Sequence, residues 1–161
     1  METIVRHATE TDLPAILELL VLKSEFDGCP EALVATEEQL RQAFFSSSPQ
    51  AYVLLAVVDG QPMGLATYFS TFSTYVGRPG LWLDDLYVRE ECRSRGVGKA
   101  LMVELARMAQ RLGCGRIDWT VALRNERGIA FYERQGAVVH HPTRVVRLDA
   151  EGIERLAEKV G

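Results

Sequence analysis

The sequence predicts a mixed α/β fold in which a hairpin-built half precedes a half of alternating strands and helices. Three observations predict it. Residues 51–58 form an almost continuous apolar run rich in Val, Leu and Tyr, as in a buried strand. Asp59-Gly60 then supplies a hairpin turn. Further along, residues 96–112 carry apolar side chains every three or four positions, which indicates an amphipathic helix.

The N-terminal third is predicted to hold one short strand and two helices. Residues 4–6 are the strand candidate. Thr11 can cap a helix over residues 12–26, and Pro14 is tolerated in the first turn of that helix. Residues 36–39, Thr-Glu-Glu-Gln, form a capping box, so we expect a second helix to begin there.

The rest of the chain continues the sheet and then alternates between strands and helices. The hairpin returns along residues 61–72, and a third strand covers residues 81–88. Gly113 is well placed to end the long helix. The remaining predicted elements are a strand at 117–121, a helix at 125–135, strands at 138–140 and 143–148, and a helix at 150–160.

Length and composition bound the classes of function. A chain of 161 residues with 47% apolar residues fits one domain over 1–161. The net charge of −4 argues against nucleic-acid binding through bulk positive charge. Three cysteines without metal spacing predict neither a disulfide framework nor a metal site. With no signal-peptide pattern and no apolar run of about 20 residues, we expect a cytoplasmic protein with no membrane partner.

A glycine-containing turn precedes the long helix and carries the clearest chemical signal. Backbone N–H groups at a helix start, together with the helix dipole, form an anion site, and basic neighbours suit a diphosphate. The alternative is a turn whose basic residues are merely solvated. The pattern fits neither a P-loop nor a Rossmann fingerprint. The turn consists of Arg93, Ser94, Arg95, Gly96, Val97, Gly98 and Lys99.

These residues resemble the GNAT superfamily of acyl-CoA-dependent N-acetyltransferases. Residues 93–98 match the family's Arg/Gln-x-x-Gly-x-Gly/Ala turn, and residues 81–88, LWLDDLYV, resemble its central strand. Residues 125–137, NERGIAFYERQGA, and the opening residues 4–12 also fit. The resemblance implies a mixed, mostly antiparallel sheet with a splayed parallel pair and helices on both faces. It also implies acetyl-CoA as cosubstrate.

Within that superfamily the chain is most similar to the diamine, or spermidine/spermine-like, branch. The resemblance implies acetylation of a primary amine on a small molecule, a polyamine or a lysine-like amino acid, and a homodimer. Asp84 stands where that branch usually has Glu, and Leu123-Arg124 precedes Asn125 where an aromatic is common. An acetyltransferase for protein amines and a non-catalytic acyl-CoA sensor remain alternatives.

The resemblance also assigns roles to single residues. Tyr132 would protonate the departing CoA sulfur, although it could instead be a core aromatic beside Phe131. Asp84 would act as a base, directly or through water; alternatively, Asp84 and Asp85 only attract a cation or anchor a loop. On a regular strand these two neighbours would face opposite sides. Asn125 would contact the cofactor or cap its helix.

Two further groups complete the predicted site. A backbone N–H near Leu86, Tyr87 or Val88 would polarise the thioester carbonyl, by resemblance to the family's central strand. The candidates for binding the amine are carboxylates and aromatic side chains near the predicted cleft, namely Glu25, Asp27, Glu31, Asp84, Asp85, Tyr75 and Trp82.

Overall fold

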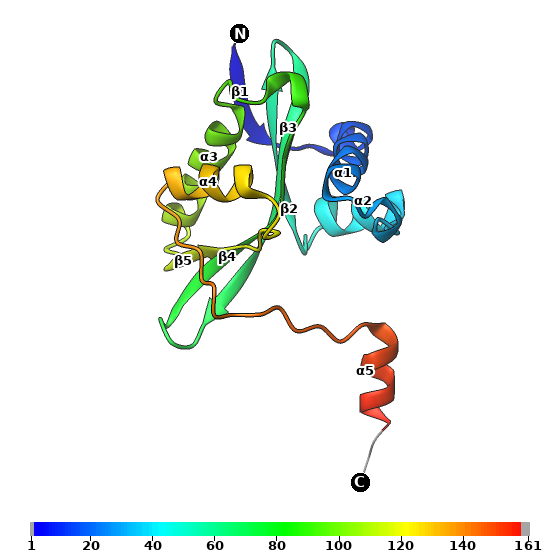
Figure 1. Cartoon of the computed structure of the whole chain (residues 1–161). Coiled ribbons are helices and arrows are strands. Elements are labelled where there is room, and N and C mark those ends of the chain that lie inside the picture. Colours follow the sequence, from blue (N-terminus) through cyan, green and yellow to red (C-terminus); the bar gives the residue numbers. More distant parts are fainter. Residues whose placement is uncertain (1, 159–161) are drawn as a thin grey trace. The chain divides into compact units, whose positions relative to one another are not determined.

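Five strands form one sheet in the order β1-β2-β3-β4-β5, so each strand lies beside its neighbour in the chain (Figure 1). The structure is a computed structural model and describes residues 2–158. The chain divides into two units, Met1–Thr120, which holds the sheet, and Val121–Gly161. The strands are β1 Thr3–His7, β2 Tyr52–Val58, β3 Gln61–Ser73, β4 Arg78–Val88 and β5 Arg116–Asp118.

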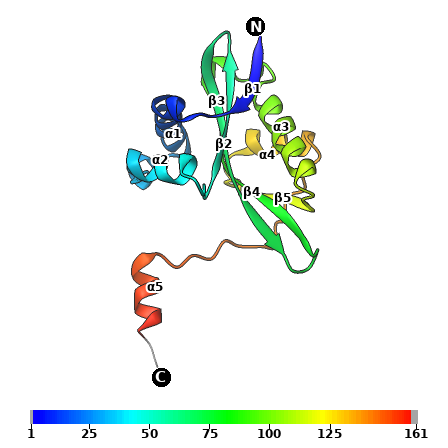
Figure 2. The ribbon, with the colours of Figure 1, turned by 180° about the vertical axis from the view of Figure 1, so that it is seen from behind.

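Helices α1 and α2 cover one face of this sheet and α3 covers the other, as the two opposite views show (Figures 1 and 2). The predicted helices at residues 12–26 and 96–112 are confirmed to within one residue at each end. The helices of the first unit are α1 Leu13–Asp27, α2 Glu37–Phe45 and α3 Val97–Arg111, and those of the second are α4 Glu126–Arg134 and α5 Ala150–Ala157. Short 3-10 turns lie at Glu10–Asp12, Pro30–Ala32 and Glu90–Cys92.

The sheet is antiparallel except at its last pair, which confirms the predicted mixed sheet. β1 to β4 pair antiparallel in sequence. β5 runs parallel to β4 and pairs only with the start of that strand, at Gly80, Leu81 and Trp82. Among the described residues, therefore, no strand pairs with the later part of β4 on the β5 side.

Alternating apolar positions on the strands build a core on both faces. On the face that α1 and α2 cover, the buried cluster consists of Ile16, Leu19, Leu20, Val53, Leu55, Leu65 and Tyr87. The intervening strand positions and the inner side of α3 fill the opposite face, including Leu54, Ala56, Ala66, Val97, Leu101 and Leu105.

Local sequence signals account for several of the turns and caps. Asp59 and Gly60 both have positive φ, 47° and 83°, as a two-residue hairpin turn requires. Thr36 caps α2 reciprocally with Gln39: its hydroxyl accepts from the Gln39 N–H at 3.2 Å, and its own N–H donates to Gln39 Oε1 at 2.8 Å. Gly113, with φ of 69°, ends α3 as predicted.

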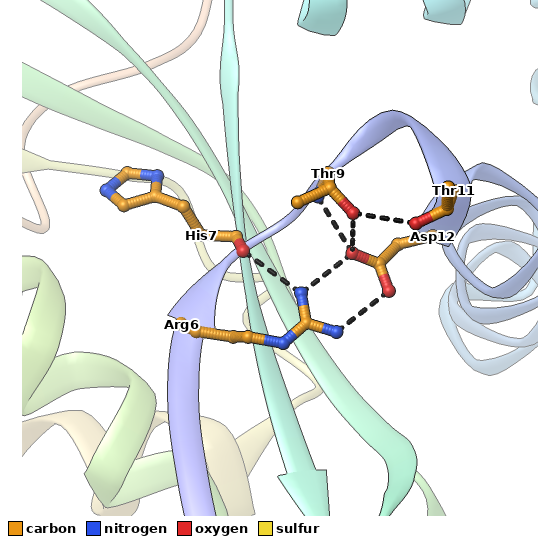
Figure 3. Close-up of polar contacts among 5 residues, drawn as sticks. All are labelled: Arg6, His7, Thr9, Thr11 and Asp12. Carbon is orange, nitrogen blue, oxygen red and sulfur yellow. Dashed lines mark hydrogen bonds and ion pairs between the residues drawn. The ribbon is translucent and has the colours of Figure 1, made fainter.

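A paired network joins the end of β1 to the start of α1 (Figure 3). Arg6 donates to both carboxylate oxygens of Asp12, at 2.7 and 2.9 Å. Asp12 also accepts from the Thr9 N–H at 2.8 Å and the Thr9 hydroxyl at 3.0 Å. The hydrogen bond from Arg6 is the main reason why the pKa of Asp12 lies far below its ordinary value.

Four predictions for the C-terminal part differ from the structure or extend beyond the described residues. The strands predicted at 138–140 and 143–148 are wrong, because the structure has no strand there. Apolar alternation supplies the pattern of a strand but not the neighbouring strand with which it must pair. β5 is shorter than the predicted 117–121, and α5 ends at Ala157, while residues 159–160 of the predicted helix lie outside the described residues.

Within residues 2–158, none of the helices has both the length and the apolar character needed to cross a bilayer.

Candidate active site

A β-bulge in β4 shapes the candidate site. Thr67 of β3 pairs with Asp85, whereas the next residue, Tyr68, pairs with Leu83. Asp84 is therefore an extra residue in β4 without a partner on β3, which is the definition of a bulge. Such irregularities bend the strand locally and change the direction of a side chain.

Because of the bulge, Asp84 and Asp85 present their carboxylates to the same face of the sheet. Asp85 is bonded to Thr67, which accepts from the Asp85 N–H at 3.1 Å and donates to Oδ2 at 2.6 Å. Two residues along β3, Phe69 stacks on Trp82, with ring centroids 6.4 Å apart. The Trp82 indole N–H donates to Asp84 Oδ1 at 3.3 Å. The prediction that the two aspartates face opposite sides is therefore wrong.

Lys23, near the C-terminal end of α1, joins this carboxylate group. Its ammonium lies 2.5 Å from Asp27 Oδ2 and 3.3 Å from Asp85 Oδ1. Burial tends to lower the pKa of Lys23, but the bond to Asp27 and the charges of Asp85 and Asp27 outweigh it, so the pKa is raised and the ammonium persists. Sequence reasoning missed this residue; the only signal was the four-residue spacing of Lys23 and Asp27 on a helix.

Asp84 has the opposite electrostatic balance. Partial loss of surrounding water and the negative charge of Asp85 raise the pKa of Asp84 above its ordinary value. The bond from Trp82 and the charge of Lys23 offset only part of that rise. Asp84 is exposed, and no ion pair joins it to another described residue. This carboxylate is therefore accessible and more easily protonated than an ordinary aspartate.

The turn before α3 has the backbone conformation of an anion site. Ser94 and Gly96 both have positive φ, 62° and 85°, and Gly96 is the residue immediately before the helix. The first backbone bond into the helix runs from Ala100 N to Gly96 O, so the N–H groups of the first turn have no helical acceptor. A Cβ built on Gly96 would meet no atom within 4 Å from the described residues other than its two chain neighbours. The start of α3 is thus not covered by side chains at this residue.

The Arg93 side chain binds the protein itself. Its Nε donates to Val88 O at 2.9 Å, and its guanidinium lies 4.7 Å from the Phe26 ring centre and 5.4 Å from that of Tyr87. These contacts tie the turn to the end of β4 and to the last turn of α1. The sequence predicted that the charge of Arg93 lies beside a bound diphosphate. The structure shows in addition that Arg93 contacts both α1 and β4 and so links these two elements.

The open side of β4 completes the arrangement in the first unit. β5 pairs with β4 only as far as Trp82, and β4 continues to Val88. Leu86, Tyr87 and Val88 lie in that later part of the strand, a few residues before the anion turn. Backbone groups on an unpaired strand side can hydrogen-bond an extended ligand as a further strand would.

Two predicted residues lie in the second unit. Asn125 caps α4, because its side-chain oxygen accepts from the Gly128 N–H at 2.9 Å. Tyr132 lies within α4, with its ring edge-on to Phe131 at 5.3 Å between centroids. The capping role that the sequence allowed for Asn125 is confirmed.

The remaining candidates for amine binding lie apart from the carboxylate group or on its margin. Tyr75 is 99% exposed in the loop between β3 and β4. It precedes Arg78, the first residue of β4, and Asp84 lies six positions further along that strand, which is about 20 Å at the usual rise. Glu25 and Glu31 are exposed, and neither is joined by an ion pair to Lys23 within the described part of the chain.

In the part of the chain that the structure describes, no three His, Cys, Asp or Glu side chains are grouped so that they could bind a metal ion. Cys29, Cys92 and Cys114 are free thiols.

Known proteins match both the sequence and the fold. The thialysine N-epsilon-acetyltransferase of Bos taurus is 30% identical over 83% of this chain and 82% of its own length. The L-ornithine N5-acetyltransferase NATA1 of Arabidopsis thaliana is 25% identical over 94% of this chain and 86% of its own. An integron cassette protein from the mobile metagenome of V. cholerae superposes with a TM-score of 0.79 at 26% identity, covering 99% of both chains. The model of the acetyltransferase (GNAT) family matches residues 13–137, and the chain belongs to that family.

Proposed function

We propose that the protein transfers an acetyl group from acetyl-CoA to a primary amine of a small molecule, by direct attack of the amine while both substrates are bound. The observation that carries this proposal is the open side of β4 directly before the anion turn at Gly96. The family and the relatives that act on thialysine and ornithine support the reaction and the class of substrate.

The anion turn would hold the diphosphate of CoA. Its backbone N–H groups and the dipole of α3 would supply the donors, with Arg95 and Lys99 adding positive charge. Arg93 would contribute through its backbone, since its guanidinium is engaged with Phe26 and Tyr87. The residues from Arg93 to Lys99 would thus bind the diphosphate, and Asn125 would contact the cofactor, as the family resemblance implies.

The later part of β4 would align the thioester. A backbone N–H at Leu86, Tyr87 or Val88 would donate to the carbonyl oxygen as negative charge develops there. One such donor contributes about 2.7–4 kcal/mol to lowering a barrier of this kind. The donor is already fixed by the strand, so no rearrangement is needed during the reaction.

Proton transfer would fall to Asp84 and Tyr132. A primary amine with a pKa near 10 is mostly ammonium at neutral pH and must lose a proton before it attacks. Asp84, accessible and with a raised pKa, would take that proton directly or through water. Tyr132 would donate its phenol proton to the departing sulfur.

The amine would bind beside Asp84 against Trp82, whose ring stacks on Phe69 and can pack on an alkyl chain. Asp85 and Asp27 would act on amine binding indirectly, by holding Lys23 in position beside the site. Glu25 would add negative charge at the margin of this group, whereas Tyr75 is left out of the proposed amine site because its loop lies about 20 Å along β4 from Asp84. We further propose that both units form one domain, since the family match at 13–137 crosses their boundary, and that the protein forms a homodimer.

A thiol-release assay with acetyl-CoA against ornithine, thialysine, spermidine and an N-terminal peptide tests the proposal. We expect release with a small amine and little with the peptide; release with the peptide alone would instead indicate a protein acetyltransferase. CoA binding without release for any amine would indicate a sensor. Absence of CoA binding in calorimetry would overturn the proposal altogether.

Two variants separate binding from chemistry. Gly96→Val should weaken CoA binding, because valine cannot easily adopt the φ of 85° that the turn needs; the space beside Gly96 is open, so crowding by protein atoms is not the cause. Tyr132→Phe should bind CoA like the wild type and lose most of its turnover. The reverse pattern would contradict both assignments.

A further inference from the structure

The acidic group beside Asp84 already contains a cation of the protein. Lys23 Nζ bridges Asp27 at 2.5 Å and Asp85 at 3.3 Å, and only 18% of the Lys23 side chain is exposed. The two partners lie on different elements, α1 and β4, so the ammonium joins the helix to the sheet. Lys23 is therefore an ordered part of the group and not a mobile surface charge.

The bridge engages two of the three carboxylates and leaves the third available. Asp85 uses Oδ1 for Lys23 and Oδ2 for the hydroxyl of Thr67, which is buried. Asp27 is bound to Lys23 as well. Asp84 receives only the long bond from Trp82 and has no ion pair with another described residue. A positively charged group that arrives from solution thus finds, among these three described carboxylates, only Asp84 without an ion pair to a cation of the protein.

We propose that Lys23 is a specificity-determining residue, which favours amines of single net positive charge, such as lysine-like amino acids, over polyamines. The inference rests on the function proposed above and names the class of substrate within it. A polyamine brings a second ammonium, and that group would have to compete with Lys23 for Asp27 and Asp85. Lys23 has the advantage in this competition because the fold already holds it beside both carboxylates. The second ammonium of the polyamine would also be repelled by the positive charge of Lys23.

A lysine-like amino acid avoids this conflict. Its reactive amine can pair with Asp84, while the other end carries an ammonium and a carboxylate whose charges cancel. Such a substrate gains the same contact with Asp84 and adds no unmatched positive charge near Lys23. The discrimination therefore arises from an unfavourable contact with the wrong substrate and needs no additional contact with the right one.

The test compares dissociation constants of ornithine and spermidine for the CoA-bound protein by calorimetry, in the wild type, Lys23→Met and Lys23→Arg. We expect Lys23→Met to tighten spermidine relative to ornithine by about tenfold at low salt, with Lys23→Arg close to the wild type. Arg41→Met is the matched control: it removes one positive charge from a surface group with Glu10, Glu37 and Glu38, and it should leave the ratio unchanged.

Two outcomes would contradict the inference. An unchanged ratio in Lys23→Met with the wild-type fold, or the same shift in Arg41→Met, overturns the inference. If Lys23→Met does not fold, Lys23→Gln at the same position gives the same readout. The measurement needs no turnover, so it remains decisive even if thiol release shows that the protein is not an acetyltransferase; conversely, an active enzyme with an unchanged ratio would leave the proposed reaction standing.

Discussion

The ion-paired groups at the two ends of α1 join this helix to the sheet, and they differ in charge balance. At the N-terminal end, one guanidinium meets one carboxylate, Arg6 with Asp12, in a two-bonded pair (Figure 3). At the C-terminal end, the single ammonium of Lys23 meets Asp27 and Asp85, with Asp84 beside them. The first group is matched, and the second has more acids than bases.

The pKa shifts follow from that difference. The matched pair lowers the pKa of Asp12 far below its ordinary value, so this carboxylate stays ionised and serves as a joint. The unmatched group raises the pKa of Asp84, because Lys23 is shared and Asp85 is adjacent. A carboxylate that is shifted toward protonation and accessible is suited to proton transfer. Charge balance thus separates the structural group at one end of α1 from the group at the other end, for which we propose a role in proton transfer.

The largest expected effect concerns turnover. Asp84→Asn removes the proposed base while keeping the shape, and it should lower kcat by on the order of 10²–10⁴-fold with an intact fold. Asp12→Asn is the matched control at the other end of α1 and should keep kcat near the wild-type value. Steady-state kinetics with the best amine measure both. A rise in KM alone for Asp84→Asn would show that Asp84 only attracts the ammonium.

An intermediate effect concerns stability at the matched pair. Asp12→Asn should lower the free energy of unfolding at neutral pH by about 1–2 kcal/mol, since it removes charge-assisted bonds from Arg6 and Thr9. Because the folded pKa of Asp12 is lowered, this contribution is complete above the ordinary value of 3.8 and declines as the pH falls from there toward the folded value. Urea unfolding at several pH values measures it. A wild-type advantage that grew toward acid would contradict the assignment.

The smallest expected effect has the opposite sign. A raised pKa means that the fold disfavours ionised Asp84, so the group stabilises the protein only while protonated and that stability is lost as the pH rises through its folded pKa. At neutral pH, Asp84→Asn should therefore raise Tm slightly. Asp85→Asn, which loses bonds to Lys23 and Thr67, should lower it. A lower Tm for Asp84→Asn would show that the carboxylate is a structural partner after all.

Sequence reasoning reached the features that neighbours in the chain determine. The Asp59-Gly60 hairpin, the cap at Thr36 and the end of α3 at Gly113 each depend on the conformation of a few adjacent residues. The positions along the chain of the first four strands, α1 and α3 were also predicted, because apolar periodicity reflects which face is buried. The family resemblance, confirmed by the match at 13–137, supplied the rest of the architecture.

Features that depend on how distant segments pair or pack could not be predicted from the sequence. The bulge at Asp84 exists only because β3 and β4 pair as they do, and nothing in the residues 83–85 themselves indicates it. The bridge from Lys23 to Asp85 likewise needs α1 to lie across β4. The strands predicted at 138–140 and 143–148 failed for a related reason, since a strand needs a neighbour as well as a pattern.

The extra residue in β4 sets a condition for anyone who would transplant this acidic pair into another scaffold. On a regular strand, two adjacent aspartates would point to opposite faces of the sheet. A lysine placed like Lys23 could then lie near only one of the two carboxylates. Shortening β4 by a single residue here should have the same outcome without altering any charge. A transplanted site would therefore need the β-bulge between the two strands, because the Asp-Asp dipeptide alone would not place both carboxylates on one face.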